Sequence, residues 1–335
     1  MNVKGQLRTP DDLLRLSNNY WSACVLHAAV KLDLFTPLSA CPFTVADLAG
    51  LVGCDERGLA MLLNALAAMG LLEKVGDAWS ATAFAAEYLS GTSPRYLGHI
   101  IRHHHHLMAS WTHLDEAVRT GAPIRERYAQ ADEAVTRESF ALGMFDLAML
   151  NAPRIVPGID LSGRGRLLDL GGGPGTYAVH FCLHYPGLSA LVFDLPSTRP
   201  FAEEIIARFG LSDRISFTAG DYLTDHIPGR YDVAWLSHIL HAEGPQECAV
   251  ILEKAVSVLD PGGMILVQEF ILDDTEDGPL YPALFSLNML QGTTSGRAYS
   301  GARLVDLLAA AGVCELRRLP LDLPNGAGVI AGIVP

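Results

Sequence analysis

A glycine-rich stretch offers the clearest binding chemistry in this chain. Asp169, Gly171, Gly173 and Gly175 stand at alternate positions directly after a short apolar run. Glycine accepts positive φ and carries no Cβ, so a ligand can lie flat against such a loop. Thr176 occupies the position where a dinucleotide-binding loop needs its last glycine, which favours a nucleoside without a pyrophosphate. The Asp169 carboxylate would attract a cation, such as the sulfonium of S-adenosylmethionine, and would repel a phosphate.

Two further acidic positions agree with a nucleoside site, although a lone glycine loop is also a common strand-to-helix turn. Asp194 ends the next apolar run, where α/β nucleotide-binding folds place an acid on the ribose hydroxyls. Asp221 and Tyr222 follow Gly220 after the run 215–218, where a carboxylate and an aromatic face can hold an adenine. Each acid alone is compatible with an ordinary loop. Three acids at three successive strand ends favour an adenosyl ligand.

His241 is the candidate general base. If the adenosyl ligand is S-adenosylmethionine, the expected reaction is methyl transfer, an in-line displacement at the sulfonium carbon. A hydroxyl attacks only as its proton leaves, so a base that titrates near neutrality suits such a reaction. His241 follows the run 231–237, at the expected ligand edge of the sheet. The alternatives are a structural histidine in the core or at a helix cap, and His238, three residues earlier, as the base or as part of the substrate pocket.

The elements that would position these residues alternate between strand and helix. A first strand runs from residue 166 through Asp169, and apolar runs predict further strands over residues 190–194, 215–218, 231–237, 263–270, 314–319 and 328–334. Helices are predicted after the glycine loop, over 245–259 with Pro245 in the first turn, and over 302–311. This alternation predicts an α/β fold with a parallel, doubly wound, Rossmann-like sheet and a ligand at the carboxyl ends of its strands.

With these motifs the chain resembles the class I S-adenosylmethionine-dependent O-methyltransferases of the plant phenolic and hydroxyindole type, including their bacterial antibiotic-pathway relatives. The likeness covers nearly the whole chain and rests on Leu-Asp-Leu-Gly-Gly-Gly-Pro-Gly-Thr (168–176), Val-Phe-Asp-Leu-Pro (192–196), Gly-Asp-Tyr (220–222), Leu-Ser-His-Ile-Leu-His (236–241), Leu-Asp-Pro-Gly-Gly (259–263) and Asn-Met-Leu (288–290). The resemblance implies S-adenosylmethionine as cofactor, S-adenosylhomocysteine as its product, and a homodimer acting on a small molecule.

The resemblance also implies roles for individual residues. It makes His241 the general base and Glu269 the carboxylate that steadies it, whereas spacing alone leaves Glu269 equally compatible with a solvated strand end. Together with the residue chemistry, it predicts cofactor contacts at Asp169, Gly171, Gly173, Gly175, Asp194, Leu195, Gly220, Asp221, Tyr222 and Ser237. Asn288 and Met289 are expected to line the substrate pocket.

Two departures from the family pattern affect the acceptor. Relatives usually carry His-Asp-Trp where this chain has His241, Ala242 and Glu243, and Ala298 stands where they tend to have a second glutamate. Glu243 is therefore a candidate catalytic carboxylate that substitutes for a lost one. Otherwise the base is less supported, and the alternative is methylation of carbon or sulfur, or a reaction without methyl transfer on the same cofactor.

Residues 1–95 predict a separate winged-helix domain. Helical patterns over 19–35, 43–49 and 55–69 precede a hairpin from Gly70. A DNA-binding regulator is the rival class, but the would-be recognition helix opens with Asp55 and Glu56 and continues apolar through Leu72, which would repel phosphate. We therefore expect this apolar face to bury against a second protomer and expect no nucleic-acid partner.

Residues 96–154 predict a helical connector that contributes to the substrate pocket, and residues 155–335 form the predicted methyltransferase domain. Residues 96–121 form one helical pattern with a histidine run at 103–106. Histidines at this spacing make a metal site conceivable, but no cysteine or paired carboxylate joins them, so we expect none. Expected pocket residues from this region are Met108, Trp111, Met144 and Phe145, with core packing as the alternative.

Composition limits the remaining possibilities. The 335 residues have a net charge of −13, which argues against a general nucleic-acid partner and suits a small cationic cofactor. Six separated cysteines without a CxxC pair indicate buried thiols in a reducing compartment. No apolar run reaches membrane-spanning length and residues 1–12 lack a signal-peptide core, so we expect a cytoplasmic protein. Residues 121–129 and 273–279 are the expected loops.

Overall fold

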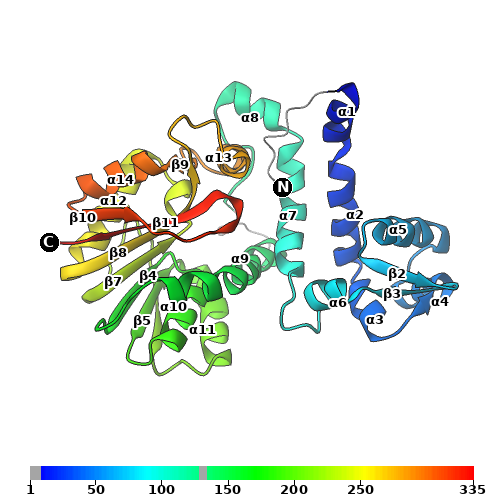
Figure 1. Ribbon diagram of the computed structural model, residues 1–335, viewed down its shortest axis with the longest axis horizontal. Coiled ribbons are helices and arrows are strands. Elements are labelled where there is room, and N and C mark those ends of the chain that lie inside the picture. Colours follow the sequence, from blue (N-terminus) through cyan, green and yellow to red (C-terminus); the bar gives the residue numbers. More distant parts are fainter. Residues whose placement is uncertain (1–8, 128–133) are drawn as a thin grey trace. The chain divides into compact units, whose positions relative to one another are not determined.

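The computed structural model describes residues 9–127 and 134–335 and divides the chain into two compact units, Met1–Met108 and Ala109–Pro335 (Figure 1). Each unit is described by itself. The predicted connector over residues 96–154 is shared between the two units, and its limits as a separate domain stay a prediction.

The first unit follows the predicted order of helices and a hairpin. Its elements are α1 (Pro10–Asn18), α2 (Tyr20–Lys31), α3 (Phe35–Ala40), β1 (Phe43–Thr44), α4 (Val45–Val52), α5 (Glu56–Ala68), β2 (Leu72–Val75), β3 (Ala78–Ala81) and α6 (Ala83–Leu89). The strands pair antiparallel in the order β1-β3-β2. Thr44, Asp55 and Thr82 begin α4, α5 and α6, because each side chain accepts a hydrogen bond from a backbone N–H of the first turn.

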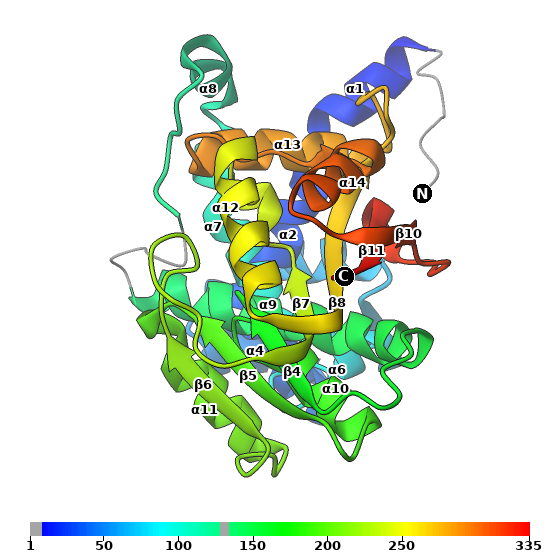
Figure 2. The same ribbon diagram turned by 90° about the vertical axis from the view of Figure 1, so that its left-hand side faces the viewer.

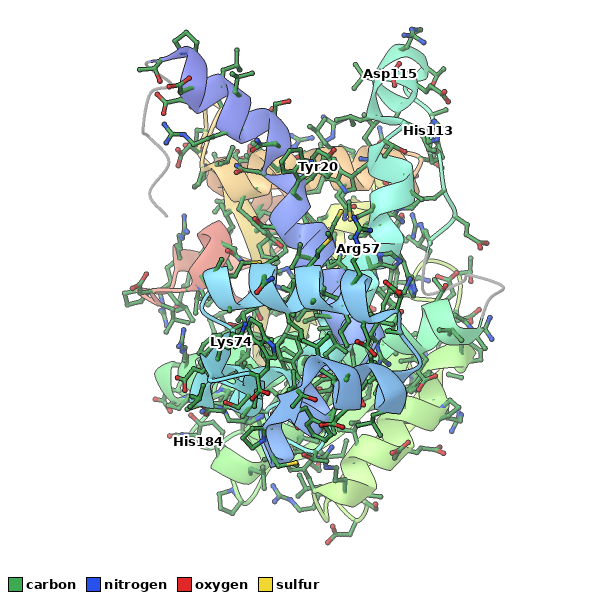
Figure 3. The ribbon with its side chains drawn as sticks, turned by 90° about the vertical axis from the view of Figure 1, so that its right-hand side faces the viewer. Tyr20, Arg57, Lys74, His113, Asp115 and His184 are labelled. Carbon is green, nitrogen blue, oxygen red and sulfur yellow. The ribbon has the colours of Figure 1, made fainter. Side chains whose placement is uncertain are left out.

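The apolar face of α5 lies inward, which corrects the expectation that it meets another protomer. Leu59, Leu63 and Leu66 recur at helical spacing and pack in the core of the first unit. The exposed apolar side chains of this unit include Met61 on α5, at 55%, and Tyr20 and Trp21 on α2, at 57% and 60%, and α1 buries no residue at all. Figure 3 shows Tyr20 on α2, Arg57 on α5 and Lys74 on β2.

The helix predicted over residues 96–121 is two helices, α7 (Gly98–Trp111) and α8 (Leu114–Thr120). The Thr112 hydroxyl donates to the carbonyl of Ala109 at 2.7 Å, and His113 leaves the helical conformation with φ −110° and ψ 21°. A threonine side chain that bonds the preceding turn competes with helix continuation. The residues after α8, as far as Arg127, form no helix or strand, as predicted for this loop, whose residues 128 and 129 lie outside the described part of the chain.

The second unit is built on a mixed sheet in the order β10-β11-β8-β7-β4-β5-β6. The parallel strands are β4 (Arg166–Leu170), β5 (Ser189–Asp194), β6 (Ile215–Ala219), β7 (Tyr231–Ser237) and β8 (Leu259–Leu272), and β9 (Tyr299–Ser300) pairs with the end of β8. The predicted parallel sheet is mixed at one edge, where β10 (Cys314–Arg318) and β11 (Ala327–Ile333), the predicted closing pair of strands, are antiparallel. The short connection between these two strands leaves no room for the crossover that parallel strands need.

Helices cover both faces of this sheet (Figures 1 and 2). One face packs against α9 (Ala134–Ile155), α10 (Thr176–His184) and α11 (Arg199–Arg208), and the other against α12 (Pro245–Ser257) and α14 (Gly301–Ala310). Neighbouring strand residues alternate between the two cores: Leu167 and Trp235 face one, and Leu168 and Leu236 face the other. Helix α13 (Leu280–Gly292) follows the predicted loop at residues 273–279.

Short single-turn helices complete the description: η2 (Val156–Gly158), η3 (Pro196–Thr198), η4 (Leu240–Ala242) and η5 (Pro324–Gly326). Across the described ranges no helix combines the length and the apolar character needed to span a bilayer. All six cysteines are free thiols, but Cys24, Cys41 and Cys314 are exposed, so the expectation of buried thiols holds for only part of the set.

Candidate active site

The glycine loop after β4 has the backbone that its sequence predicts. Gly171, Gly173 and Gly175 have φ of 64°, 55° and 72°. A Cβ on Gly171 would lie 2.5 Å from Cγ2 of Ile239, so this position has neither the conformation nor the space for a side chain. The loop leads into α10, whose first residue is Thr176.

Asp194 at the end of β5 fixes this loop from the neighbouring strand. Its Oδ2 accepts from the backbone N–H of Gly173 at 2.7 Å, and its Oδ1 accepts from the N–H of Leu195 at 2.6 Å and from the Thr198 hydroxyl at 3.0 Å. Burial raises the pKa of Asp194, while these hydrogen bonds oppose the shift. Its bond to a ribose stays a prediction.

Asp169 lies underneath the loop. It is 1% exposed, its Oδ2 accepts from the N–H of Ala178 at 3.2 Å, and a Cβ on Gly172 would collide with its carboxyl group. Burial raises the pKa of Asp169 to about 7, and the charge of Asp194 adds to the shift. Within residues 9–127 and 134–335, Asp169 Oδ1 and the Thr176 hydroxyl have no hydrogen-bond partner.

The remaining predicted cofactor residues lie at the ends of β6 and β7. Asp221 bonds its own turn, where its Oδ1 accepts from the N–H of Leu223 at 2.8 Å. The Tyr222 hydroxyl donates to Glu243 Oε1 at 3.1 Å, and the Ser237 hydroxyl bonds Gln268 Oε1 at 3.1 Å. Gly220 packs so closely against the ring of Phe193 that it has no space for a Cβ. The carboxyl edge of the sheet therefore gathers these residues, although their contacts with a cofactor stay predictions.

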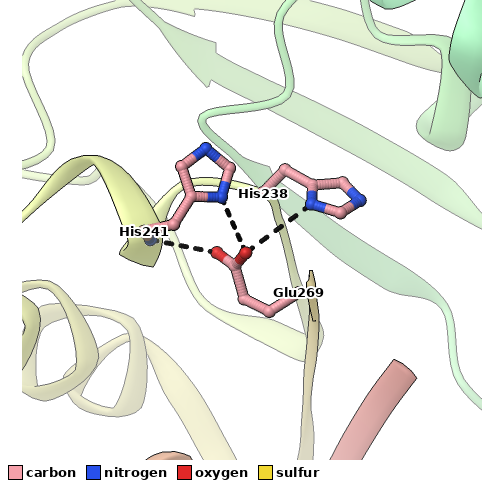
Figure 4. A group of neighbouring side chains, drawn as sticks. All are labelled: His238, His241 and Glu269. Carbon is pink, nitrogen blue, oxygen red and sulfur yellow. Dashed lines mark hydrogen bonds and ion pairs between the residues drawn. The ribbon is translucent and has the colours of Figure 1, made fainter. Parts of the chain in front are cut away.

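His241 and Glu269 form a buried hydrogen-bonded pair (Figure 4). His241 lies in η4 just after β7, and Glu269 lies on the adjacent strand β8. His241 Nδ1 lies 2.7 Å from Glu269 Oε2, and the backbone N–H of His241 donates to Oε1 at 3.2 Å. His241 is 8% exposed and Glu269 1%. Neighbouring strands thus bring together two residues that are distant in sequence, as the resemblance predicted.

The charge on Glu269 determines the tautomer of His241. Burial alone would raise the pKa of Glu269, but the charge of His241 and contacts with His238 and His241 outweigh it and hold the pKa well below its usual range. An ionised carboxylate only accepts hydrogen bonds, so Nδ1 of neutral His241 carries the proton. Nε2 then keeps its lone pair, which is the requirement for a general base.

His238 approaches the same carboxylate oxygen as His241 does. Its Nδ1 lies 3.6 Å from Glu269 Oε2, which is too long for a hydrogen bond, and its ring centroid lies 4.3 Å from that of Phe270. The ligand atoms of His238, His241 and Glu269 lie within 4.8 Å of one another, a set that also suits a metal ion. The 2.7 Å between His241 Nδ1 and Glu269 Oε2 is a hydrogen-bond distance, and the acid–base role of this pair stays a prediction.

Aromatic side chains that the sequence analysis missed surround these histidines. The ring centroid of Phe285 on α13 lies 4.7 Å from that of His241, nearly perpendicular to it. Phe270 lies 4.7 Å from Phe285 and 5.0 Å from Tyr281. Tyr281 and Phe285 stand four residues apart in a largely apolar segment, a spacing that would have indicated one aromatic helix face.

Glu243 bonds to Arg127 and Tyr222 in the described part of the chain. Arg127 Nη1 donates to its Oε1 at 2.6 Å and Arg127 Nη2 to its Oε2 at 3.0 Å. The described hydrogen bonds of the Glu243 side chain go to Arg127 and Tyr222 and not to His241. The role of Glu243 as a catalytic carboxylate therefore stays a prediction. Ala298 is 3% exposed and has no side-chain acid, so Glu269 alone supports the His241 imidazole among the residues described.

The predicted substrate-pocket residues are spread over several elements. Phe145 packs in the core between the sheet and α9 to α11, which favours the structural alternative for this residue. Asn288 Oδ1 accepts from Arg125 at 3.2 Å, and Met289 is 8% exposed on α13. Trp111 and Met144 are half-buried in the second unit, whereas Met108 ends the first. Contacts with an acceptor stay predictions for all of them.

The histidine run packs within the first unit. Lys31 Nζ lies 3.0 Å from His105 Nε2, and the His27 ring meets the His105 ring edge-on at 5.7 Å. Because the ammonium donates to His105 Nε2, that nitrogen has no lone pair left for a metal.

Two family descriptions match the sequence. Residues 111–314 match an O-methyltransferase domain, and residues 14–91 match an O-methyltransferase dimerisation domain. The chain is 36% identical over 329 residues to 3-hydroxy-5-methyl-1-naphthoate 3-O-methyltransferase of Streptomyces sahachiroi. The aligned residues cover 97% of this chain and 95% of that protein. It is 33% identical over 333 residues to the tetracenomycin polyketide synthesis 8-O-methyl transferase of Streptomyces glaucescens, with 97% of each chain covered.

A solved structure has the same fold. The crystal structure of human N-acetylserotonin methyltransferase in complex with S-adenosylmethionine superposes with a TM-score of 0.84 at 28% sequence identity. The superposition covers 98% of this chain and 99% of the human one.

Proposed function

Since this chain belongs to the O-methyltransferase family, we propose that it transfers the methyl group of S-adenosylmethionine to a hydroxyl of a small aromatic metabolite. The two bacterial relatives are named for O-methylation, one of a hydroxynaphthoate, and the human relative was crystallised with S-adenosylmethionine. The observation that carries the proposal is the His241–Glu269 pair at the carboxyl edge of the sheet.

The residues at this edge suit S-adenosylmethionine. The positive-φ glycines let the loop backbone approach a ligand closely, and Asp194 fixes that loop by accepting from the N–H of Gly173. The unpartnered oxygens of Asp169 and Thr176 offer polar groups toward a ligand. We propose that Asp194 holds the ribose, that Asp221 and Tyr222 hold the adenine, and that the Asp169 carboxylate faces the sulfonium.

His241 would act on the acceptor. Bound S-adenosylmethionine supplies an electrophilic methyl group on a positively charged sulfur. In our proposal, Nε2 of His241 takes the proton of the acceptor hydroxyl as the oxygen attacks, and Glu269 keeps Nδ1 protonated and stabilises the imidazolium that forms. The rings of Phe270, Phe285 and Tyr281 would exclude water and offer apolar faces to a flat acceptor.

We also propose that two copies of the chain associate through the first unit. This unit matches a dimerisation domain. It exposes Leu13, Leu14, Leu16, Tyr20 and Trp21, each more than half accessible, along α1 and the start of α2. Large apolar side chains exposed in this number favour burial in an interface.

Methyl transfer to a defined set of acceptors tests the proposed reaction. The purified chain would be incubated with methyl-labelled S-adenosylmethionine and a panel of hydroxynaphthoates and other phenols, each paired with its non-hydroxylated analogue. We expect label in an aryl methyl ether from at least one hydroxylated member and none from its analogue. Label on carbon or sulfur in an active member would contradict oxygen as the acceptor atom.

A further inference from the structure

Arg127 and Glu243 form a two-point ion pair that the proposed reaction does not use. Two guanidinium nitrogens donate to the two carboxylate oxygens, at 2.6 and 3.0 Å, and Nη2 also donates to the carbonyl of Ala242 at 2.9 Å. The Glu243 side chain is 3% exposed and the Arg127 side chain 31%. A buried carboxylate is stable only with such partners. The two-point geometry therefore fixes the positions of both the Glu243 carboxylate and the Arg127 guanidinium.

Tyr222 connects the pair to the strands on the other side of the point where the strand order reverses. Its hydroxyl donates to Glu243 Oε1 at 3.1 Å, and burial raises the pKa of Tyr222, so the group stays a donor. Tyr222 follows β6, whereas Glu243 follows β7. The strand order reverses between β4 and β7, and ligands of doubly wound sheets lie in the crevice at that reversal. The Tyr222–Glu243 bond therefore crosses from one side of this crevice to the other.

Residues 124–127 attach the same pair to α13. The backbone N–H groups of Ile124 and Arg125 both donate to the carbonyl of Gln291, at 2.9 and 3.0 Å. Arg125 Nη2 donates to Asn288 Oδ1 at 3.2 Å. The segment thus runs from the helix that carries Phe285, next to His241, to the carboxylate that holds Tyr222.

We propose that the Arg127–Glu243 pair positions Tyr222 against the adenosyl group of S-adenosylmethionine, so that Glu243 sets cofactor affinity and takes no part in proton transfer. The inference rests on the proposed function. A tyrosine held by its hydroxyl presents a fixed ring face, which loses less entropy when an adenine stacks on it. Arg127 and Glu243 are positioning residues, because they act on the cofactor through Tyr222.

Calorimetry with S-adenosylhomocysteine on the full chain tests the proposal. We expect Arg127→Gln and Glu243→Gln each to weaken binding about tenfold, which corresponds to about 1.4 kcal/mol. Arg127→Lys keeps the charge but not the two-point geometry, and it should recover part of the affinity. Arg119→Gln is the matched control, because Arg119 pairs with Asp115 on the exposed surface of α8, and it should bind as the parent does.

Kinetics separates positioning from proton transfer. With an active acceptor, Glu243→Gln should raise the KM for S-adenosylmethionine about tenfold and leave kcat within about twofold. A large loss of kcat with unchanged affinity for S-adenosylhomocysteine would make Glu243 a catalytic carboxylate and overturn the proposal.

Tyr222→Phe tests the positioning of Tyr222 if the variants of Arg127 and Glu243 fail to fold. It removes one hydroxyl and keeps the ring, and we expect about threefold weaker binding because the ring loses its anchor. Parent affinity in this variant would overturn the proposal. A parent chain that binds no S-adenosylhomocysteine at all would instead contradict the proposed function.

Discussion

In its proposed role as a base, His241 depends on Glu269, which occupies its other nitrogen. The 2.7 Å contact at Nδ1 places the proton away from Nε2, and the carboxylate stays ionised because its pKa lies well below the usual range. The backbone N–H of His241 bonds the same carboxylate, which fixes the position of the ring as well as its tautomer. The resemblance paired the two residues, whereas spacing alone could not, because their contact depends on the register of β7 beside β8.

Asp169 makes a prediction about pH. Its pKa of about 7 means that the carboxyl group ionises around neutrality, and only the ionised form attracts a sulfonium. Affinity for S-adenosylmethionine should therefore rise up to about tenfold from pH 6 to pH 8 by proton linkage. S-adenosylhomocysteine has no sulfonium and is the internal control, measured by calorimetry at the same pH values.

The ratio of the two affinities is the deciding quantity. It should become independent of pH in Asp169→Asn, whose amide does not titrate in this range. An identical pH dependence for both ligands in the parent chain would show that Asp169 does not face the sulfonium.

At the scale of elements, the proposed ligand site depends on the glycine loop and the strand ends around it. Gly173 has φ 55°, and a Cβ added there would meet no atom within 4 Å, so the position tolerates a side chain in space but not in conformation. Its N–H bonds Asp194, which ties the loop to β5.

Gly173→Ala should remove cofactor binding at a small cost in stability. A positive-φ alanine costs about 1 kcal/mol, and its methyl group would project from a loop where the ligand must lie close to the backbone. Gly163→Ala is the matched control, since Gly163 also has positive φ, at 78°, and no atom within 4 Å of a Cβ. Both variants should lose similar stability on thermal unfolding, but only Gly173→Ala should fail to bind S-adenosylhomocysteine. Equal binding by the two would contradict the placement of the ligand on this loop.

The elements could be predicted from sequence where local pattern determines them. Apolar runs ending in Asp169, Asp194 and Ser237 gave strands β4, β5 and β7, because periodicity and glycine placement are local signals. The break after Trp111 depends on a side-chain bond from Thr112, and the antiparallel edge depends on which strand β11 joins. Local pattern also could not predict the ion pair at the site, because Arg127, the partner of Glu243, lies 116 residues away in a segment without regular structure.

At the scale of the whole molecule, the exposed apolar surface of the first unit predicts its association. Leu14 and Trp21 are 64% and 60% exposed, and α1 packs no residue into the core. Leu14→Glu combined with Trp21→Glu should convert a dimer to a monomer, because each charge would have to lose its hydration in the interface. Light scattering gives the mass directly. Leu183→Glu, at a 51% exposed position on α10, is the control and should leave the mass unchanged. A parent chain that stays monomeric at high concentration would refute the proposed dimer.

The first unit should also lose stability in acid through His27. Burial lowers the pKa of His27 to about 4, and the charges of His105, His104 and Lys31 add to the shift. The unfolded chain binds this proton near the ordinary value of 6.5, so it holds more protons than the folded chain between pH 4 and pH 6.5. The free energy of unfolding should therefore fall as the pH falls through this window, by about 2 kcal/mol at pH 5 relative to pH 7.5.

Calorimetric unfolding at the two pH values checks this sign. His27→Asn should flatten the pH dependence, because the amide does not titrate, while His184→Asn, at an exposed position, should keep it. A pH dependence that His27→Asn leaves intact would assign the effect to other groups.

The most direct test of the account compares chemistry with binding in His241→Asn. Asparagine keeps a polar side chain of similar size but offers no basic nitrogen, so we expect methyl transfer to an active phenol to fall at least about a hundredfold. The Kd for S-adenosylhomocysteine, measured on the same preparation, should stay within about twofold of the parent value, because His241 is assigned to the acceptor. A variant that binds the cofactor normally and methylates at the parent rate would contradict the assignment of His241 as the base.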